Sequence, residues 1–147
     1  MNLKQLGLSG TRVSDLSPLA QMKNLRCLGL DGTQLSGLSA SVNLTRLEQL
    51  DLSDTHVADL KSLAGLTNLR VLSLDRSHVT DLTSLAGLTN LRVLELSSSQ
   101  VGDFTQLASL KQLTELWLSF VQVADDEKVK LQKALPNCRI EIYPDSP

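Results

Sequence analysis

The chain has 147 residues, the size of a single domain, and apolar residues make up 41% of it, enough for a packed core. Its 14 basic and 16 acidic residues give a net charge of −2, which excludes the basic excess that binding to nucleic acid or anionic membranes requires. No apolar run approaches the roughly 18 residues that span a bilayer, and Met1–Gln5 is no signal peptide. The chain as written is therefore predicted to be cytoplasmic, unless it is a fragment of a secreted or surface protein.

The dominant feature of the sequence is a repeat of 22 residues without insertions. Five full copies and a partial sixth begin at Leu3, Leu25, Leu47, Leu69, Leu91 and Leu113. Leucine occupies positions 1, 4 and 6 of every copy, position 9 is Thr or Ser in the first five, and position 13 is Asp in five of six. A fixed period of this length indicates stacked repeats, each of which forms one rung of an array.

Each repeat is predicted to form a strand, a turn and a short helical return. Positions 4 and 6 alternate with outward residues, which is strand periodicity, whereas apolar positions 14, 17 and 20 recur every three residues, as on a helix face. The position-15 hydroxyls are expected to be N-caps: Ser17, Ser39, Thr83 and Thr105. Pro18 suits a first helical position. Because one rung cannot bury both faces alone, the rungs must stack, with a parallel sheet on one side.

The consensus L-x-x-L-x-L-x-x-T-x-V-x-D-L-x-x-L-x-x-L resembles the leucine-rich-repeat family in its 22-residue bacterial, internalin-like form, over residues 3–143. The resemblance implies an α/β solenoid with a concave parallel sheet, short helices or 3-10 turns on the convex face, and protein binding through the sheet. Many members carry Asn at position 9, whose amide bonds the backbone between rungs. This chain has single hydroxyls there, on Thr11, Thr33, Thr55, Ser77 and Ser99, so we expect a weaker ladder in the same fold.

The C-terminal end of the array has the sequence of a cap. After three acidic residues at 125–127, Leu131, Ala134 and Leu135 share one helix face, and residues 138–143 alternate as a seventh strand. This resembles the C-terminal caps of such arrays. The expected organisation is five repeats over residues 3–112, a sixth repeat with capping helix and strand over 113–143, and a tail over 144–147.

The N-terminal end has no comparable cap, since Leu3 already begins a repeat and nothing before it would cover Leu6 and Leu8. Terminal repeats normally need a polar cap. We therefore expect either further sequence upstream or cover by another chain, with weak self-association through this repeat.

The outward positions 3, 5, 7 and 8 of the predicted sheet indicate a binding surface. The first two rungs carry small residues there, whereas later rungs carry large apolar side chains rimmed by carboxylates. The expected partner-binding residues are Trp117, Phe120, Val93, Val71, Glu95, Glu115, Asp51 and Ser73. The alternative is that Trp117 packs against the C-terminal cap. The acidic rim predicts a protein partner with a basic patch.

Other polar columns are better explained by structure than by chemistry. The position-13 carboxylates are expected to bond N–H groups of the helical return rather than calcium: Asp15, Asp59, Asp81, Asp103 and Asp125. His56 and His78 occupy position 10 of adjacent rungs, about 5 Å apart. Two ligands are too few for a zinc site, so both are expected to be surface residues.

Two further groups are assigned no chemical role. The position-2 cations are expected to be solvated rather than joined in a cross-sheet charge lattice: Lys4, Arg26, Arg70 and Arg92. Cys27 and Cys138 are several rungs apart, beyond the roughly 7 Å between Cα atoms that a disulfide spans, so both are expected to be free thiols.

No nucleophile–base pair, phosphate loop or carboxylate pair in a cleft is visible, so we expect no catalytic residue, metal or cofactor. The predicted function is a non-catalytic protein–protein interaction module that binds neither nucleic acid nor membrane. The alternative is the recognition segment of a larger regulatory or catalytic protein, such as a bacterial effector or ubiquitin ligase, whose active domain lies outside this chain. A carbohydrate or small-molecule sensor ranks last, because the chain has one Trp, one Tyr and two Phe.

Overall fold

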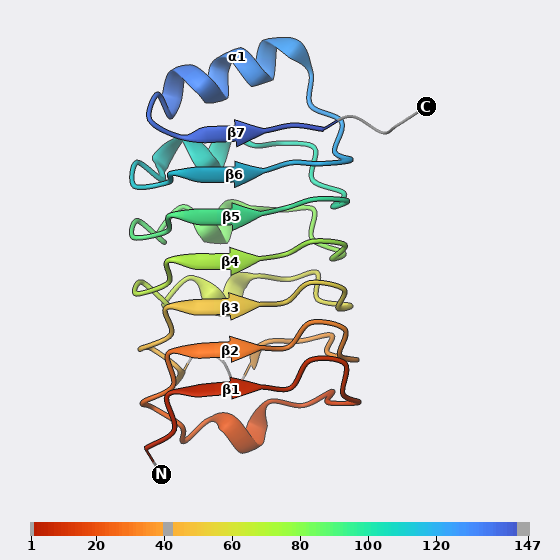
Figure 1. Ribbon diagram of the computed structural model, residues 1–147, viewed down its shortest axis with the longest axis vertical. Helices are drawn as coiled ribbons and strands as arrows, with labels where there is room; N and C mark the ends of the chain where they lie inside the picture. The colour runs from red at the N-terminus through yellow and green to blue at the C-terminus, as the bar shows by residue number, and fades with distance from the viewer. Residues whose placement is uncertain (1, 40–42, 144–147) are drawn as a thin grey trace.

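The computed structural model describes residues 2–39 and 43–143, and these form a stack of rungs with one open parallel sheet along its side (Figure 1). Within them seven strands lie side by side in chain order: β1 (Gln5–Gly7), β2 (Cys27–Gly29), β3 (Gln49–Asp51), β4 (Val71–Ser73), β5 (Val93–Glu95), β6 (Glu115–Trp117) and β7 (Arg139–Glu141). Because the repeat has no insertion, neighbouring strands pair at the same repeat position, as Leu28 does with Leu50. The predicted tail, 144–147, lies outside the described residues.

The helical returns on the side opposite the sheet are 3-10 helices. They are η1 (Ser17–Leu19), η3 (Lys61–Leu63), η4 (Thr83–Leu85) and η5 (Thr105–Ser109). A 3-10 helix has three residues per turn, which suits apolar residues that recur every three positions. In the sixth rung α1 (Asp125–Ala134) takes the place of this return and packs against η5 (Figure 1). The predicted solenoid with a C-terminal helix and strand is confirmed.

A single leucine core runs through the stack between the sheet and the returns. Leu72 and Leu94 at position 4 have no solvent exposure, because each is covered by a rung on both sides. In the first rung Leu3, Leu6 and Leu8 are only partly buried. The expected self-association through this rung stays a prediction.

The position-13 aspartates, and not the position-15 hydroxyls, organise the start of the returns. Asp81 Oδ1 accepts the N–H of Thr83 at 2.8 Å and also the Thr83 hydroxyl at 2.5 Å. The same pair of bonds recurs in the first and fifth rungs. The N-cap residue of η4 is Leu82, which makes no side-chain cap bond. The expectation that Ser17, Thr83 and Thr105 are N-caps is therefore wrong, because the Asp two residues earlier binds both groups.

The position-9 hydroxyls bond within their own rung, and only the threonines do so. Thr33 and Thr55 each donate to the carbonyl oxygen three residues earlier at 2.7 Å, and Thr11 does so at 2.6 Å. The hydroxyls of Ser77 and Ser99 are buried without a partner among the described residues. The expected ladder of five hydroxyl bonds is therefore wrong for the two serines.

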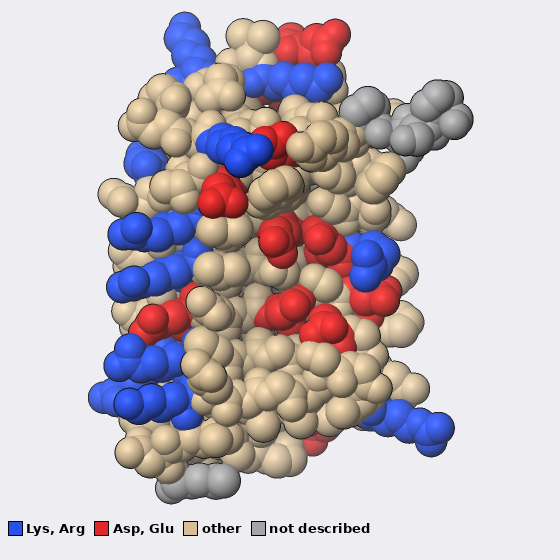
Figure 2. All heavy atoms as spheres, viewed as in Figure 1, with Lys and Arg blue, Asp and Glu red and all other residues tan. Residues whose placement is uncertain are grey.

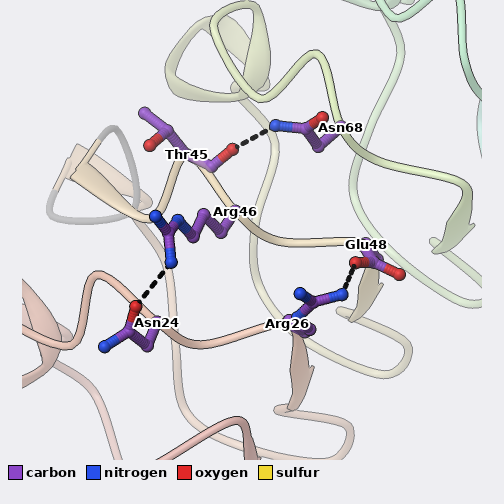
Figure 3. Close-up of polar contacts among 6 residues, drawn as sticks. All are labelled: Asn24, Arg26, Thr45, Arg46, Glu48 and Asn68. Carbon is purple, nitrogen blue, oxygen red and sulfur yellow. Dashed lines mark hydrogen bonds and ion pairs between the residues drawn. The ribbon is translucent and has the colours of Figure 1, made fainter. Parts of the chain in front are cut away.

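Polar side chains also link successive rungs along the edge where the strands begin (Figure 3). Asn68 Nδ2 donates to the Thr45 carbonyl oxygen of the preceding rung at 2.8 Å, and Asn90 repeats this bond one rung later, also at 2.8 Å. Arg46 Nη1 donates to Asn24 Oδ1 at 2.7 Å. These bonds join neighbouring rungs outside the sheet ladder.

Candidate functional site

The outward side chains of positions 3, 5 and 7 in the six rungs form what we call the sheet face. They point outward because the leucines at positions 4 and 6 point into the core. Across the six rungs this face carries five carboxylates and neither Lys nor Arg: the acids are Asp31, Asp51, Asp75, Glu95 and Glu115. Figure 2 shows acidic side chains gathered over the middle of the sheet, with basic side chains along the edge where the strands begin.

Seven of the eight predicted partner-binding residues lie together on this face, on β3–β6. Val71 and Val93 are register partners and are half-buried. Ser73 is nearly buried and donates its hydroxyl hydrogen bond to Glu95 on the next strand. Glu115 is the register partner of Val93. An apolar strip of β4 and β5 is thus bordered by carboxylates.

Trp117 lies at the outward position of β6, between Glu95 on β5 and Glu141 on β7. It is half-buried, and the guanidinium carbon of Arg139 lies 5.9 Å from the centre of its ring, a cation–π geometry. Arg139 also forms an ion pair with Glu141. The last strand, β7, therefore lies on one side of Trp117, and the tryptophan remains part of the sheet face. Its role in binding stays a prediction.

Phe120 does not lie on the sheet face, contrary to the sequence-based expectation. It lies in the turn after β6 with φ of 59°, and its N–H donates to the Tyr143 carbonyl oxygen at 2.8 Å. Position 8 is the left-handed turn residue of this repeat, as Gly10 and Gly32, both with φ of 65°, also show. The Phe120 side chain, 52% exposed, lines a separate hollow of about 650 Å³ with Ile142.

Two carboxylates at position 7, which the sequence-based site left out, add to the negative charge of the sheet face. Asp75 is half-buried, and its Oδ1 accepts the N–H of Ser97 at 2.7 Å. Burial raises the pKa of Asp75, and the nearby charge of Asp51 adds to that rise, whereas the Ser97 bonds and Arg76 oppose it. Asp31 accepts a hydrogen bond from the Ser9 hydroxyl.

A hollow of about 400 Å³ lies on the sheet face across β1–β4. Gly7 and Gly29 lie at position 5 of its first two strands, where later rungs carry side chains. The hollow therefore begins beyond the predicted site, which covers the third to sixth rungs, and overlaps it at Asp51, Val71 and Ser73. The signal for it in the sequence was the absence of a side chain at position 5 in two consecutive repeats.

The basic column at position 2 makes one ion pair with an acid of its own column. Arg26 Nη1 lies 2.6 Å from Glu48 Oε1, with both side chains partly exposed (Figure 3). Within the described residues, Lys4, Arg70 and Arg92 form no ion pair. The expectation of solvated cations thus holds for three of the four residues, and Arg26 is instead paired across the rungs with Glu48.

The histidine and cysteine pairs occupy the expected places. The rings of His56 and His78 stack 5.6 Å apart at an interplanar angle of 14°, and both residues are exposed. In no part of the chain that the structure describes do three or more His, Cys, Asp or Glu residues converge as a metal site. Cys27 and Cys138 are free thiols, and burial, with a smaller effect of the Glu115 charge, raises the pKa of Cys138 to about 11.

The register of the sheet and the unbroken repeat define a leucine-rich-repeat solenoid, a class that generally serves as a protein-interaction module and is typically non-catalytic. The chain is an internalin-like leucine-rich-repeat protein. The family model for "Leucine Rich repeats (2 copies)" matches residues 45–88. Over residues 2–39 and 43–143 there is no helix with the length and hydrophobicity to cross a membrane.

Solved structures of bacterial leucine-rich-repeat proteins are similar over nearly the whole chain. Internalin C2 of Listeria monocytogenes is 36% identical with a TM-score of 0.88, over 99% of this chain and 66% of that one. An internalin of the same species, InlF, is 26% identical with a TM-score of 0.88, over 98% and 43%. A leucine-rich-repeat protein of Leptospira interrogans is 29% identical with a TM-score of 0.84, over 95% and 37%. The chain thus spans less than two thirds of each protein. Among curated protein sequences, none matches significantly.

Proposed function

We propose that the chain is a non-catalytic module that binds a protein partner through its sheet face. The observation that carries this proposal is the set of outward apolar side chains on β4–β6. Val71 and Val93 are register partners, and Trp117 lies one outward position further along β6, next to the carboxylates of Glu95 and Glu115. Apolar side chains held outward on a rigid sheet are suited to a partner that excludes water from them. Trp117 is the expected centre of the contact because a tryptophan buries the most area.

The partner is proposed to carry a basic patch opposite the sheet face. Positions 3, 5 and 7 of the six rungs carry five carboxylates and neither Lys nor Arg, so this face attracts such a patch and repels an acidic one. This attraction mainly increases the association rate, and added salt weakens it. The partner's affinity should therefore fall as ionic strength rises.

Capture of the partner from the native cell, followed by affinity measurements on variants, tests the proposal. Trp117→Ala should cost about 2 kcal/mol of binding, roughly a 30-fold loss of affinity, with little change in melting temperature. Val129→Ala is the matched control, because Val129 lies on α1, is 68% exposed and is remote from the sheet face in repeat position. An unchanged affinity together with a sharply lower melting temperature would make Trp117 a packing residue of the C-terminal cap and refute the site.

A further inference from the structure

The hollow on the first four strands contains a feature that the fold does not account for. Gly7 and Gly29 lie at its outward position 5, and neither has a positive φ, in contrast to the turn residues Gly10 and Gly32. A Cβ atom at Gly7 would meet no heavy atom within 4 Å, and one at Gly29 would meet Ser9 Oγ at 3.4 Å, an ordinary contact. Neither backbone conformation nor packing requires glycine here. Its effect is to leave the strand backbone open to close approach from outside.

The remaining lining of the hollow is mixed polar and apolar, with a single charge. Of the described residues that line it, Asp51 alone is charged. Asp51 Oδ1 accepts the N–H of Ser53 at 2.9 Å, and no cation is paired with this carboxylate among the described residues. The rest of the lining includes the exposed amides of Gln5 and Gln49, the half-buried Cys27 and Val71, and the leucines of the first three strands. The Asp51 carboxylate and the Gln49 amide, both on β3 at the end of the open floor over Gly7 and Gly29, are suited to a cation on an aliphatic stem.

We infer that this hollow receives the side chain of an arginine or lysine of the partner protein. The stem would lie over Gly7 and Gly29, and the cationic head would bind Asp51, which follows them in the same row of the sheet. The choice of a cation follows from the whole sheet face, which carries five acids and no base. The inference rests on the proposed function, since it names the chemistry of the same partner, and it extends the contact to the first two rungs.

The test uses a small probe in place of the partner. The ¹⁵N-labelled chain is titrated with the tripeptide acetyl-Gly-Arg-Gly-amide, and the backbone amide shifts are followed by NMR. The same peptide with citrulline in place of arginine is the control, because citrulline keeps the shape and loses the charge. We expect saturable shifts at Gly7, Gly29 and Asp51, at least about fivefold weaker binding of the citrulline peptide, and weaker binding in high salt.

Two variants test whether the peptide binds in the hollow. Gly29→Val fills the floor and Asp51→Asn removes the charge, and each should weaken binding about tenfold or more while the melting temperature is retained. Gly37→Val is the matched control, since a Cβ at Gly37 also meets nothing within 4 Å and this residue lies outside the sheet face. If Gly29→Val does not fold, Asp51→Asn alone still decides the outcome.

Three results would overturn the inference. They are equal binding of the citrulline peptide, binding that Gly29→Val and Asp51→Asn leave unchanged, and tighter binding of free spermidine, which would make the hollow a site for small cations. The probe assay contains no partner and Trp117 does not line the hollow. A negative result with the probe therefore does not affect the Trp117→Ala test of the proposed function. If the Trp117→Ala test instead refutes the proposed function, the probe assay still shows whether the hollow binds a cationic side chain.

Discussion

At the residue scale, position 9 shows the effect of one methyl group: its threonine hydroxyls make a hydrogen bond, and the hydroxyls of Ser77 and Ser99 make none within the described part of the chain. Threonine is branched at Cβ and has few χ1 rotamers, which favours the bond to the carbonyl three residues earlier that Thr33 and Thr55 make. Serine lacks this restriction, and the Ser77 and Ser99 hydroxyls are buried at 4% and 9% exposure without a partner among the described residues. A buried unpaired hydroxyl costs about 1–3 kcal/mol.

Ser77→Thr should therefore stabilise the protein. We expect the free energy of unfolding in urea to rise by about 1 kcal/mol, because the new hydroxyl bonds the Leu74 carbonyl and the added methyl group is buried. Thr55→Ser is the reverse control and should lower it by a similar amount. A fall in stability for Ser77→Thr would show that the site has no room for the methyl group.

The aspartates before the returns predict part of the pH dependence of stability. The pKa of Asp81 is lowered, first by the hydrogen bond from the Thr83 hydroxyl and then by that from the Thr83 N–H. A carboxyl whose pKa is lower in the folded state contributes stability above its unfolded pKa of about 3.9, and this is lost as the pH falls through the folded value. Asp81→Asn should therefore lose less stability than the wild type between pH 7 and pH 3 in urea unfolding. Equal losses would contradict this assignment.

At the element scale, the strands and returns could be predicted from the repeat, because its period sets both the register and the inward positions. At the start of the returns, the expected bonds from backbone N–H groups to the position-13 aspartates are confirmed, for example at Asp81 and Asp103. The N-cap role expected for the position-15 hydroxyls was wrong, because both positions carry cap-forming residues and the sequence does not tell that the hydroxyl itself bonds the aspartate. The Asn68 and Asn90 bonds were missed for a similar reason, since an asparagine at the end of a repeat also fits an ordinary turn.

The turn after β6 contains a strained residue. Phe120 has a left-handed backbone with φ of 59°, which costs a bulky residue about 1–2 kcal/mol, and its side chain is half exposed. Phe120→Gly should remove this strain, and after the entropy cost of glycine the free energy of unfolding should rise by about 0.5–1 kcal/mol. A clear loss of stability would mean that the contacts of the Phe120 ring in the hollow beside Ile142 outweigh the strain.

At the scale of the whole molecule, each rung depends on its neighbours. The core is one continuous cluster, and the strands pair in register from β1 to β7. Leu72→Ala in the fourth rung should cost about 2–5 kcal/mol and shift one cooperative transition. Circular dichroism and hydrogen exchange in both halves should report the same midpoint. Separate midpoints, with one half unaffected, would contradict a single stack.

The sequence predicted most of the sheet face but not its hollow or its fully acidic character. The outward direction of Val71, Val93 and Trp117 follows from alternation along a strand. The hollow depends on missing side chains at Gly7 and Gly29, which a search for reactive or apolar residues passes over. The position of Arg139 over Trp117 depends on where the last strand joins the sheet, which residue periodicity does not determine.

The central claim is that the partner binds the sheet face, and a matched charge reversal tests it most directly. The association rate of the captured partner is compared between Asp51→Lys/Glu115→Lys on the sheet face and Asp125→Lys/Asp126→Lys on α1. Both variants change the net charge equally, and exposed ion pairs such as Asp126–Lys130 contribute little to stability. We predict an association rate at least about tenfold lower for the sheet-face variant at low salt and a nearly unchanged rate for the α1 variant. Equal rates for the two variants, with both melting like the wild type, would contradict binding through the sheet face.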